Sequence, residues 1–317
     1  MAVTFGCSLP TRGQLATPEA VRSLAQRAED LGFDSVWVSD HIILPRQVRS
    51  FYPYAADGVP AFVPDEPYFE ALSALNFLAG CTQRVRLGTH VLIVPYRNPV
   101  LTAKTLATLD VLSGGRLILG VGVGWMEEEF KALGLDTYAA RGAVTDEYLQ
   151  LYKELWTKDE PVFQGKHYQL SGSGFQPKPV QKPHPPIWIG GHTGPAIRRA
   201  ARLGDGWVPI GLRPPAVLEP EELAGKIARL RTLTKEAGRP EDAVTISFST
   251  NVSFDKTPLL SRQTMSGRPE QIAADLRQYQ DVGVRNFILS FTADSIAGQQ
   301  EALQQFSREV MPLIPQG

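Results

Sequence analysis

Two ionisable residues, Asp40 and His41, directly follow a short apolar segment of the chain. That segment, Ser35–Ser39 (SVWVS), predicts a strand covered on both faces. A histidine titrates near neutral pH and can carry a proton in catalysis, and an adjacent carboxylate can orient the imidazole or hydrogen-bond a cofactor. We therefore predict that His41 and Asp40 are catalytic. The alternative is an aspartate that caps the next segment and a histidine packed beneath a loop.

A third candidate, His90, lies in the stretch RLGTHV at 86–91, which ends the third predicted strand. Gly88 inside this segment indicates a bulge or the close approach of a ligand. His90 would lie beside His41 if the two strand ends are level. A pair of histidines could bind a metal, but the five histidines include no HxH or HxxxH spacing. We expect no metal site, and we interpret His90 as a wall residue against a flat ligand.

The first of two glycine-rich stretches, GVGVGW at 120–125, does not fit a dinucleotide-binding fingerprint. The GxGxxG pattern needs a glycine where Trp125 stands, and no acidic residue closes a strand about 20 positions later. The glycines instead allow a planar ring to lie against the strand end, and Trp125 could stack on that ring.

The second glycine-rich stretch, GGHTGP at 190–195, precedes a predicted helix that begins near Pro195. Bare amides in a glycine-rich loop and the N-terminus of a helix together form an anion site. We predict phosphate binding here, with an ordinary strand-to-helix turn as the alternative. Nothing in the sequence resembles GxxxxGK or a GxSxG elbow, so ATPase and acyl-transfer functions have no support.

These candidates stand at the ends of strands in a repeating strand-then-helix pattern. Eight such steps predict an α/β fold, a closed (β/α)8 barrel whose active site lies at the carboxyl ends of the strands. The predicted strands are Val3–Leu9, Ser35–Ser39, Val85–Thr89, Arg116–Val121, Ile187–Ile189, Gly206–Ile210, Val244–Ser249 and Asn286–Ser290. An open doubly wound sheet is the alternative, but no polar, low-complexity linker separates two halves. We predict one domain over residues 1–317.

Two stretches do not fit the barrel pattern. Residues 44–66, rich in proline and tyrosine, follow the second strand, and residues 158–186, with a predicted hairpin (PVFQGKHYQL), precede the fifth. We predict that both insertions cover the pocket. Candidate pocket contacts in the first insertion are Arg46, Arg49, Tyr52 and Tyr54, and the alternative is that these residues are solvated at the surface.

Composition and charge exclude several classes of function. Lys and Arg number 32 against 33 Asp and Glu, a formal net charge of −1, so we expect no nucleic-acid partner and no polybasic membrane anchor. No stretch is apolar over the roughly 18 residues that a membrane span needs. Cys7 and Cys81 lie far apart, which excludes a disulfide scaffold and fits a reducing compartment. We predict a cytoplasmic protein that acts on a small-molecule substrate.

Three stretches together resemble the bacterial-luciferase-like family of flavin and deazaflavin oxidoreductases. They are GFDSVWVSDHIILP at 32–45, RVRLGTHVLIVPYRNPVLTAKTLATLDVLSGGRLILGVGVGW at 84–125 and PPIWIGGHTGPAIRRAARLGDGW at 185–207. The resemblance covers nearly the whole chain. It implies a (β/α)8 barrel, usually a homodimer, that holds FMN or the deazaflavin coenzyme F420 at its carboxyl-terminal face.

The resemblance also implies roles for individual residues. Asp40 would contact the ring system, and His41 would lie near the carbon that carries the hydride. A bulge, often a non-prolyl cis peptide in the family, would fall at His90-Val91 and press on one face of the ring. The other implied cofactor contacts are Val123, Gly124 and Glu128 after the fourth strand, and Gly190, Gly191, His192, Thr193 and Gly194 around the phosphate.

The sequence Ser-Asp-His at the end of the second strand is more similar to the deazaflavin branch than to the FMN monooxygenases. A deazaflavin transfers hydride and reacts poorly with oxygen, so the resemblance implies an F420-dependent dehydrogenase or reductase of a small organic substrate. An FMN-dependent monooxygenase fed by a partner reductase is the alternative. A third possibility is a non-catalytic member that binds no cofactor.

The chain departs from the family at one position. Sugar-phosphate dehydrogenase members carry an acid after the glycines of the fourth strand, where this chain has Trp125. Proton transfer at a substrate oxygen would then fall to His41 or to one of Glu127–Glu129. This departure argues against glucose 6-phosphate as the substrate.

Overall fold

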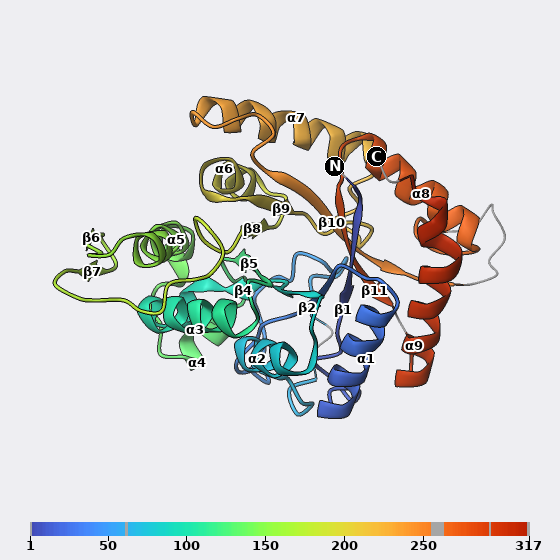
Figure 1. Cartoon of the computed structure of the whole chain (residues 1–317), viewed down its shortest axis with the longest axis horizontal. Helices are drawn as coiled ribbons and strands as arrows, with labels where there is room; N and C mark the ends of the chain where they lie inside the picture. The colour runs from blue at the N-terminus through green and yellow to red at the C-terminus, as the bar shows by residue number, and fades with distance from the viewer. Residues whose placement is uncertain (1, 61–62, 255–262, 292, 316–317) are drawn as a thin grey trace.

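The computed structural model describes residues 2–60, 63–254, 263–291 and 293–315, and within these ranges eight parallel strands close into a barrel (Figure 1). The barrel strands are β1 (Thr4–Ser8), β2 (Ser35–Val38), β3 (Arg86–Thr89), β5 (Leu117–Gly122), β8 (Ile187–Gly190), β9 (Gly206–Val208), β10 (Thr245–Val252) and β11 (Asn286–Phe291). Pairing of β3 with β5 closes the ring. The predicted (β/α)8 barrel is confirmed, and each predicted strand is present.

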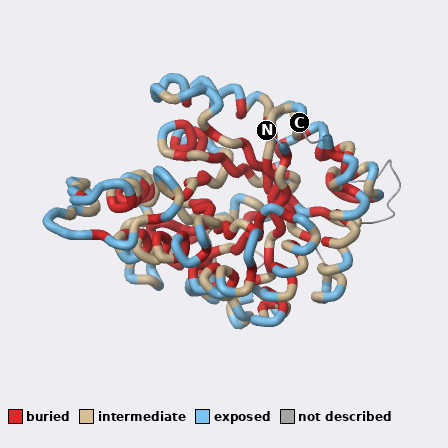
Figure 2. Tube along the Cα trace, viewed as in Figure 1, coloured by how far each residue is buried: buried red, intermediate tan, exposed pale blue. Residues whose placement is uncertain are grey.

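Helices surround the barrel on the outside (Figure 1). They are α1 (Pro18–Asp30), α2 (Ala71–Cys81), α3 (Pro99–Leu112), α4 (Glu127–Ala132), α5 (Arg141–Thr157), α6 (Gly194–Leu203), α7 (Pro220–Glu236), α8 (Pro269–Asp281) and α9 (Ile296–Gln305). Shorter turns of 3-10 or π type span Val94–Tyr96, Tyr138–Ala140, Phe306–Val310 and Met311–Leu313. Figure 2 shows the buried residues concentrated at the centre of the molecule. In the described ranges, no helix is both long enough and apolar enough to cross a membrane.

Local sequence signals set where helices begin near the mouth of the barrel. Thr17 accepts a hydrogen bond from the N–H of Ala20, and Pro18 occupies the first position of α1, where its missing N–H leaves no bond unmade. Asn98 and Pro99 open α3 in the same way. Because these helices follow β1 and β3, their caps fix the lengths of two loops at the carboxyl ends of the strands.

The second insertion lies on the side of the barrel and not over its mouth. It contains the antiparallel hairpin of β6 (Phe163–Gln164) and β7 (Gln169–Leu170), which projects beside α5 (Figure 1). Backbone N–H groups of Lys166, His167 and Tyr168 donate to the carboxylate of Glu147 on α5 and hold the hairpin there. None of residues 158–186 lines the two cavities at the mouth of the barrel. Contrary to the prediction from the sequence, this insertion therefore does not cover the pocket.

Two indole rings fill the interior of the barrel. Trp37 of β2 and Trp188 of β8 are buried with ring centroids 5.4 Å apart. Glycines on the neighbouring strands leave room for them. A Cβ on Gly88, the register partner of Trp37, would lie 2.2 Å from the Trp37 ring, and one on Gly206 would lie 2.5 Å from the Trp188 ring. The packing of the barrel interior therefore depends on two large indole rings that lie against glycines, which have no side chain.

We predict that Gly88→Ala destabilises the barrel by about 1 to 3 kcal/mol, because the added methyl group must displace a fully packed ring. Urea unfolding would measure the loss. Gly225→Ala is the matched control, since Gly225 is exposed on α7 with nothing within 4 Å of its added Cβ. The control should gain about 0.5 to 1 kcal/mol from its helix propensity. Equal unfolding midpoints for the two variants would contradict the packing argument.

Candidate functional site

Two adjoining cavities lie at the carboxyl ends of the barrel strands. The first lobe, of about 450 Å³, is lined by the ends of β5 and β8 and the first turns of α6. The second lobe, of about 340 Å³, is lined by the ends of β1, β2 and β11. Side chains shared by the two lobes mark their boundary. They are Tyr54, His90, Val91, Ile93, Trp125 and Ile210.

The boundary between the lobes is built around a break in the third strand. The peptide bond between His90 and Val91 is cis, at the position that the family resemblance implies. The short strand β4 (Leu92–Ile93) then resumes parallel pairing with β5. A Cβ on Gly122 or Gly190 would lie 2.6 Å or 2.7 Å from the Val91 side chain. The two glycines thus leave the space that Val91 occupies between the neighbouring strands.

Asp40 fixes the segment that follows this break. Its Oδ2 accepts the N–H of Ile93 at 2.9 Å, and Arg97 donates to both carboxylate oxygens at 2.7 Å and 2.8 Å. Arg97 also binds Glu70, ahead of α2, at 2.7 Å. The side chain of Asp40 is 0% exposed. We therefore interpret Asp40 as a positioning residue, in contrast to the catalytic role and the ring contact expected from the sequence.

His41 is oriented by Glu129, and not by the adjacent carboxylate of Asp40 that the sequence suggests for this task. Its Nδ1 lies 2.5 Å from Oε2 of Glu129, and the Tyr96 hydroxyl donates to the same oxygen at 2.9 Å. The N–H of Ile42 donates to the other oxygen of Glu129 at 2.7 Å. Because an ionised carboxylate only accepts hydrogen bonds, Nδ1 of His41 must carry the hydrogen. His41 itself lines the second lobe.

The charge state of Glu129 follows from the same contacts. Burial alone would raise the pKa of this fully buried carboxyl group, but the bonds from His41, Ile42 and Tyr96 outweigh burial. The pKa of Glu129 therefore lies below its ordinary value, and the group is ionised at neutral pH.

The other two glutamates at the start of α4, Glu127 and Glu128, do not contact His41. Glu128 accepts hydrogen bonds from the N–H groups of Arg49 and Ser50 and from the Ser50 hydroxyl, at 2.7 to 3.1 Å. Glu127 forms an exposed ion pair with Lys131. Neither carboxylate lines the two lobes, so the structure does not bring Glu128 to the cofactor contact that the resemblance implies. Glu128 instead anchors the first insertion.

The first insertion covers the cleft with aromatic side chains. The Tyr52 and Trp125 rings have centroids 4.9 Å apart, and the centroids of Trp125 and His41 lie 6.4 Å apart in an edge-on arrangement. Tyr54 lines both lobes, as predicted from the sequence. Arg46 instead pairs with Asp65 in an exposed ion pair. Trp125 thus forms a wall and does not fill either lobe.

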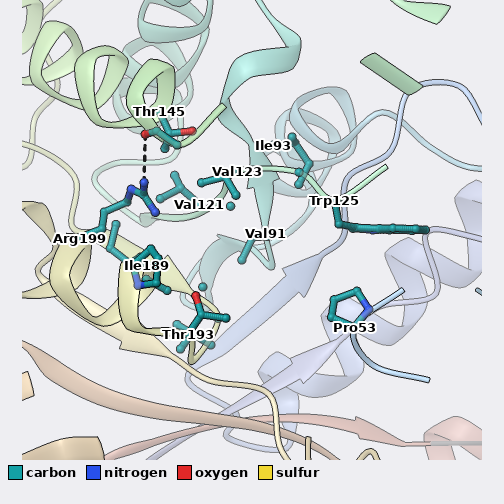
Figure 3. A pocket seen from close by; sticks show the side chains of 18 of the residues that line it. Pro53, Val91, Ile93, Val121, Val123, Trp125, Thr145, Ile189, Thr193 and Arg199 are labelled. Atoms are coloured by element: carbon teal, nitrogen blue, oxygen red, sulfur yellow. Dashed lines mark hydrogen bonds between the residues drawn. The ribbon is translucent and has the colours of Figure 1, made fainter. Parts of the chain in front are cut away.

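The first lobe has an apolar centre and a polar end (Figure 3). Val91 and Val123 project into its centre, and Arg199 stands at one end. The Arg199 guanidinium forms an ion pair with Asp146 and donates to the carbonyl of Gly142, so its charge is already compensated. Gly124, predicted as a cofactor contact, also lines this lobe.

The predicted phosphate loop borders the first lobe. Gly190, Gly191 and Thr193 line the cavity, whereas His192 and Gly194 do not. Gly191 has a φ of +89°, which an L side chain rarely adopts. No side chain caps the N-terminus of α6, so its first N–H groups need another acceptor. Three of the five predicted loop residues, together with a ten-residue helix, can therefore contact an anion.

His90 presents an unsatisfied polar atom at the boundary. Its Nε2 is buried and has no hydrogen-bond partner among the residues that the structure describes. Burial and the nearby charge of Arg213 lower the pKa of His90 to about 4. The imidazole ring of His90 is therefore neutral at pH 7. The described residues contain no cluster of His, Cys, Asp and Glu that could hold a metal ion.

A family model described as luciferase-like monooxygenase matches residues 2–259. The chain belongs to this family. An uncharacterised protein of Mycobacterium tuberculosis strain H37Rv is 37% identical over 216 residues, which cover 68% of this chain and 72% of that protein. An F420-dependent glucose-6-phosphate dehydrogenase of Amycolatopsis mediterranei is 29% identical over 94% of this chain and 95% of that protein.

The luciferase-like barrel also resembles solved structures. One is an F420-dependent secondary alcohol dehydrogenase in complex with an F420-acetone adduct. It matches with a TM-score of 0.78 and 20% identity, over 99% of this chain and 100% of that one. At this identity the likeness shows the shared fold.

We predict that acid pH weakens the contact of Glu129 with His41. Because folding lowers the pKa of Glu129, its contribution to stability is present above the ordinary value of 4.5 and is lost as the pH falls through the lower folded value. Urea unfolding should therefore show a steeper loss of stability for the wild type than for Glu129→Gln between about pH 5 and about pH 3. Glu127→Gln, on the exposed side of α4, should keep the wild-type slope. If the stability of Glu129→Gln fell with pH as steeply as that of the wild type, this prediction would be contradicted.

Proposed function

We propose that this luciferase-like chain is an F420-dependent oxidoreductase that exchanges a hydride with a small organic substrate. The observation that carries the proposal is the two-lobed cleft, with Val91 of the cis segment at its boundary and an uncapped helix N-terminus beside one lobe only. Such a cleft suits a ligand with a planar ring and a phosphate. The names of the dehydrogenase from A. mediterranei and of the alcohol dehydrogenase structure support F420 as that ligand.

The residues of the cleft fit the cofactor at three points. Gly190, Gly191 and Thr193 with the first turn of α6 would hold the phosphate. Val91 would press on one face of the ring system. The buried Nε2 of His90, which needs a partner, would meet a polar atom at the ring edge. With these contacts the ring would lie at the boundary, and the second lobe would remain for the substrate.

The residues of the second lobe would manage the proton that accompanies hydride transfer. When bound, coenzyme F420 supplies a carbon that accepts or donates a hydride. Nδ1 of His41 is bound to Glu129, so Nε2 is the nitrogen that would take a proton from a substrate hydroxyl or return it to a carbonyl oxygen. Glu129 would hold the imidazole of His41 in place during the transfer. The covering side chains Tyr52 and Trp125 would exclude water.

An FMN-dependent monooxygenase is the second candidate function. The description of the matching family model favours it, because that description names monooxygenases.

We also propose that the protein is a homodimer and that it is cytoplasmic, as expected from the sequence. Exposed apolar side chains on the adjacent helices α2 and α3, namely Phe77, Leu101 and Leu112, support the homodimer.

We predict that the purified chain binds F420 with micromolar affinity and binds FMN more weakly. Trp37 and Trp125 line the second lobe, and Trp125 also lines the first, so quenching of tryptophan fluorescence would report binding of either cofactor. Tight binding of FMN alone, with oxygen consumption in the presence of reduced FMN, would favour the monooxygenase. Binding of neither would overturn both functions and favour a non-catalytic member.

We predict that two substitutions separate cofactor binding from turnover. His41→Ala should abolish turnover and leave the F420 dissociation constant nearly unchanged, because His41 lies in the second lobe. Gly191→Val should weaken F420 binding by at least about tenfold, because a β-branched residue is strained at positive φ and would displace the loop amides. Titration and steady-state assays of both variants would test this. Full activity of His41→Ala would show that His41 takes no part in the mechanism. An unchanged F420 dissociation constant in Gly191→Val would contradict the proposal that this loop binds the phosphate.

A further inference from the structure

The second lobe carries a positive charge that the proposed chemistry does not use. Arg213 follows β9 in a tight turn closed by a bridge between Arg213 and Ala216, and its side chain lines this lobe but not the first. One of its terminal nitrogens donates to Asn251 at 2.5 Å. Its Nε is buried without a hydrogen-bond partner among the described residues. A buried N–H of a charged group without an acceptor is costly, so this atom points to a missing ligand.

The surroundings of Arg213 do not neutralise its charge. Burial lowers the pKa of Arg213, and the positive charge of Arg12 on the loop after β1 also lowers it, whereas the hydroxyl groups of Tyr52 and Tyr54 act in the opposite direction. Arg12 lines the same lobe. The one carboxylate among the described lining residues is Asp40, whose side chain is fully buried against Arg97. The described residues that line the lobe therefore offer Arg213 no accessible carboxylate.

The other side chains of the lobe are suited to a small organic molecule. Tyr52, Tyr54 and Tyr68 line it together with Phe291, and His41 lies on the same wall. A cavity of about 340 Å³ has room for a compound with a single ring or a short chain. An arginine guanidinium recognises a carboxylate through several donors in a fixed plane.

We propose that the second lobe binds its substrate through a carboxylate held by Arg213 with the support of Arg12, and that the substrates of this luciferase-like enzyme are small organic acids. This inference rests on the proposed function, because it assigns the substrate class of the same site. The carboxylate satisfies the buried Nε–H of Arg213 and offsets the repulsion between the two arginines. The remainder of the acid extends toward His41.

Benzoate and its neutral isostere benzamide test the proposal without the true substrate. Tryptophan fluorescence of the full chain, without cofactor, should show benzoate binding at least about tenfold more tightly than benzamide, the preference expected of one charged hydrogen bond. In Arg213→Gln this preference should disappear, and in Arg213→Lys, which keeps the charge without the planar group, it should be partly retained. Arg84→Gln is the matched control, since Arg84 is exposed ahead of β3, at the opposite end of the barrel.

Four outcomes would overturn the inference. The first two are equal binding of benzoate and benzamide by the wild type and an undiminished preference for benzoate in Arg213→Gln. The other two are loss of the benzoate preference in Arg84→Gln as well, and tighter binding of inorganic phosphate than of benzoate at a site that Arg213→Gln removes.

A parallel F420 titration separates this inference from the proposed function. Unchanged F420 affinity in Arg213→Gln supports a substrate contact, whereas an equal loss of F420 affinity would make Arg213 a cofactor contact. A benzoate preference in a chain that binds no F420 would contradict only the proposed function.

Discussion

The buried carboxylate of Asp40 joins the end of β2 to the segment that follows the cis peptide bond. Its oxygens bind the N–H of Ile93 and the guanidinium of Arg97, which binds Glu70 as well. Removal of one partner from a buried ion pair typically costs about 3 to 5 kcal/mol, because the other charge remains buried. His41 is the next residue after Asp40, and Val91 lies two residues before Ile93. The wall of one lobe and the boundary of both therefore depend on the same ion pair.

The barrel could be predicted from the sequence because its signals are local. Each strand is a short apolar segment, and caps such as Thr17 and Asn98 precede helices by a single residue. The roles of individual polar residues were harder to predict, since they depend on contacts between distant positions. Asp40 meets Arg97 across 57 positions, and His41 meets Glu129 across 88. The sequence names Glu127–Glu129 only as alternatives to His41 for proton transfer, and it does not indicate that Glu129 contacts the imidazole.

Arg213 shows the same limit in a different way. The sequence places it after the sixth strand, beside two prolines, where a charged residue normally faces solvent. The buried and unsatisfied Nε of Arg213 and its proximity to Arg12 appear only once the loops after β1 and β9 meet over the barrel. The two lobes consequently differ in charge. In the first, Arg199 is paired with Asp146, whereas the second keeps a charge for a ligand to neutralise.

The short helix α4 carries Glu128 and Glu129 at consecutive positions. Glu128 holds the backbone of the aromatic cover at Arg49 and Ser50, and Glu129 holds the imidazole of His41. A helix of six residues has little freedom to move one of these side chains without the other. The aromatic cover and the imidazole of His41 are therefore both held by the same short helix, so a displacement of α4 would move both.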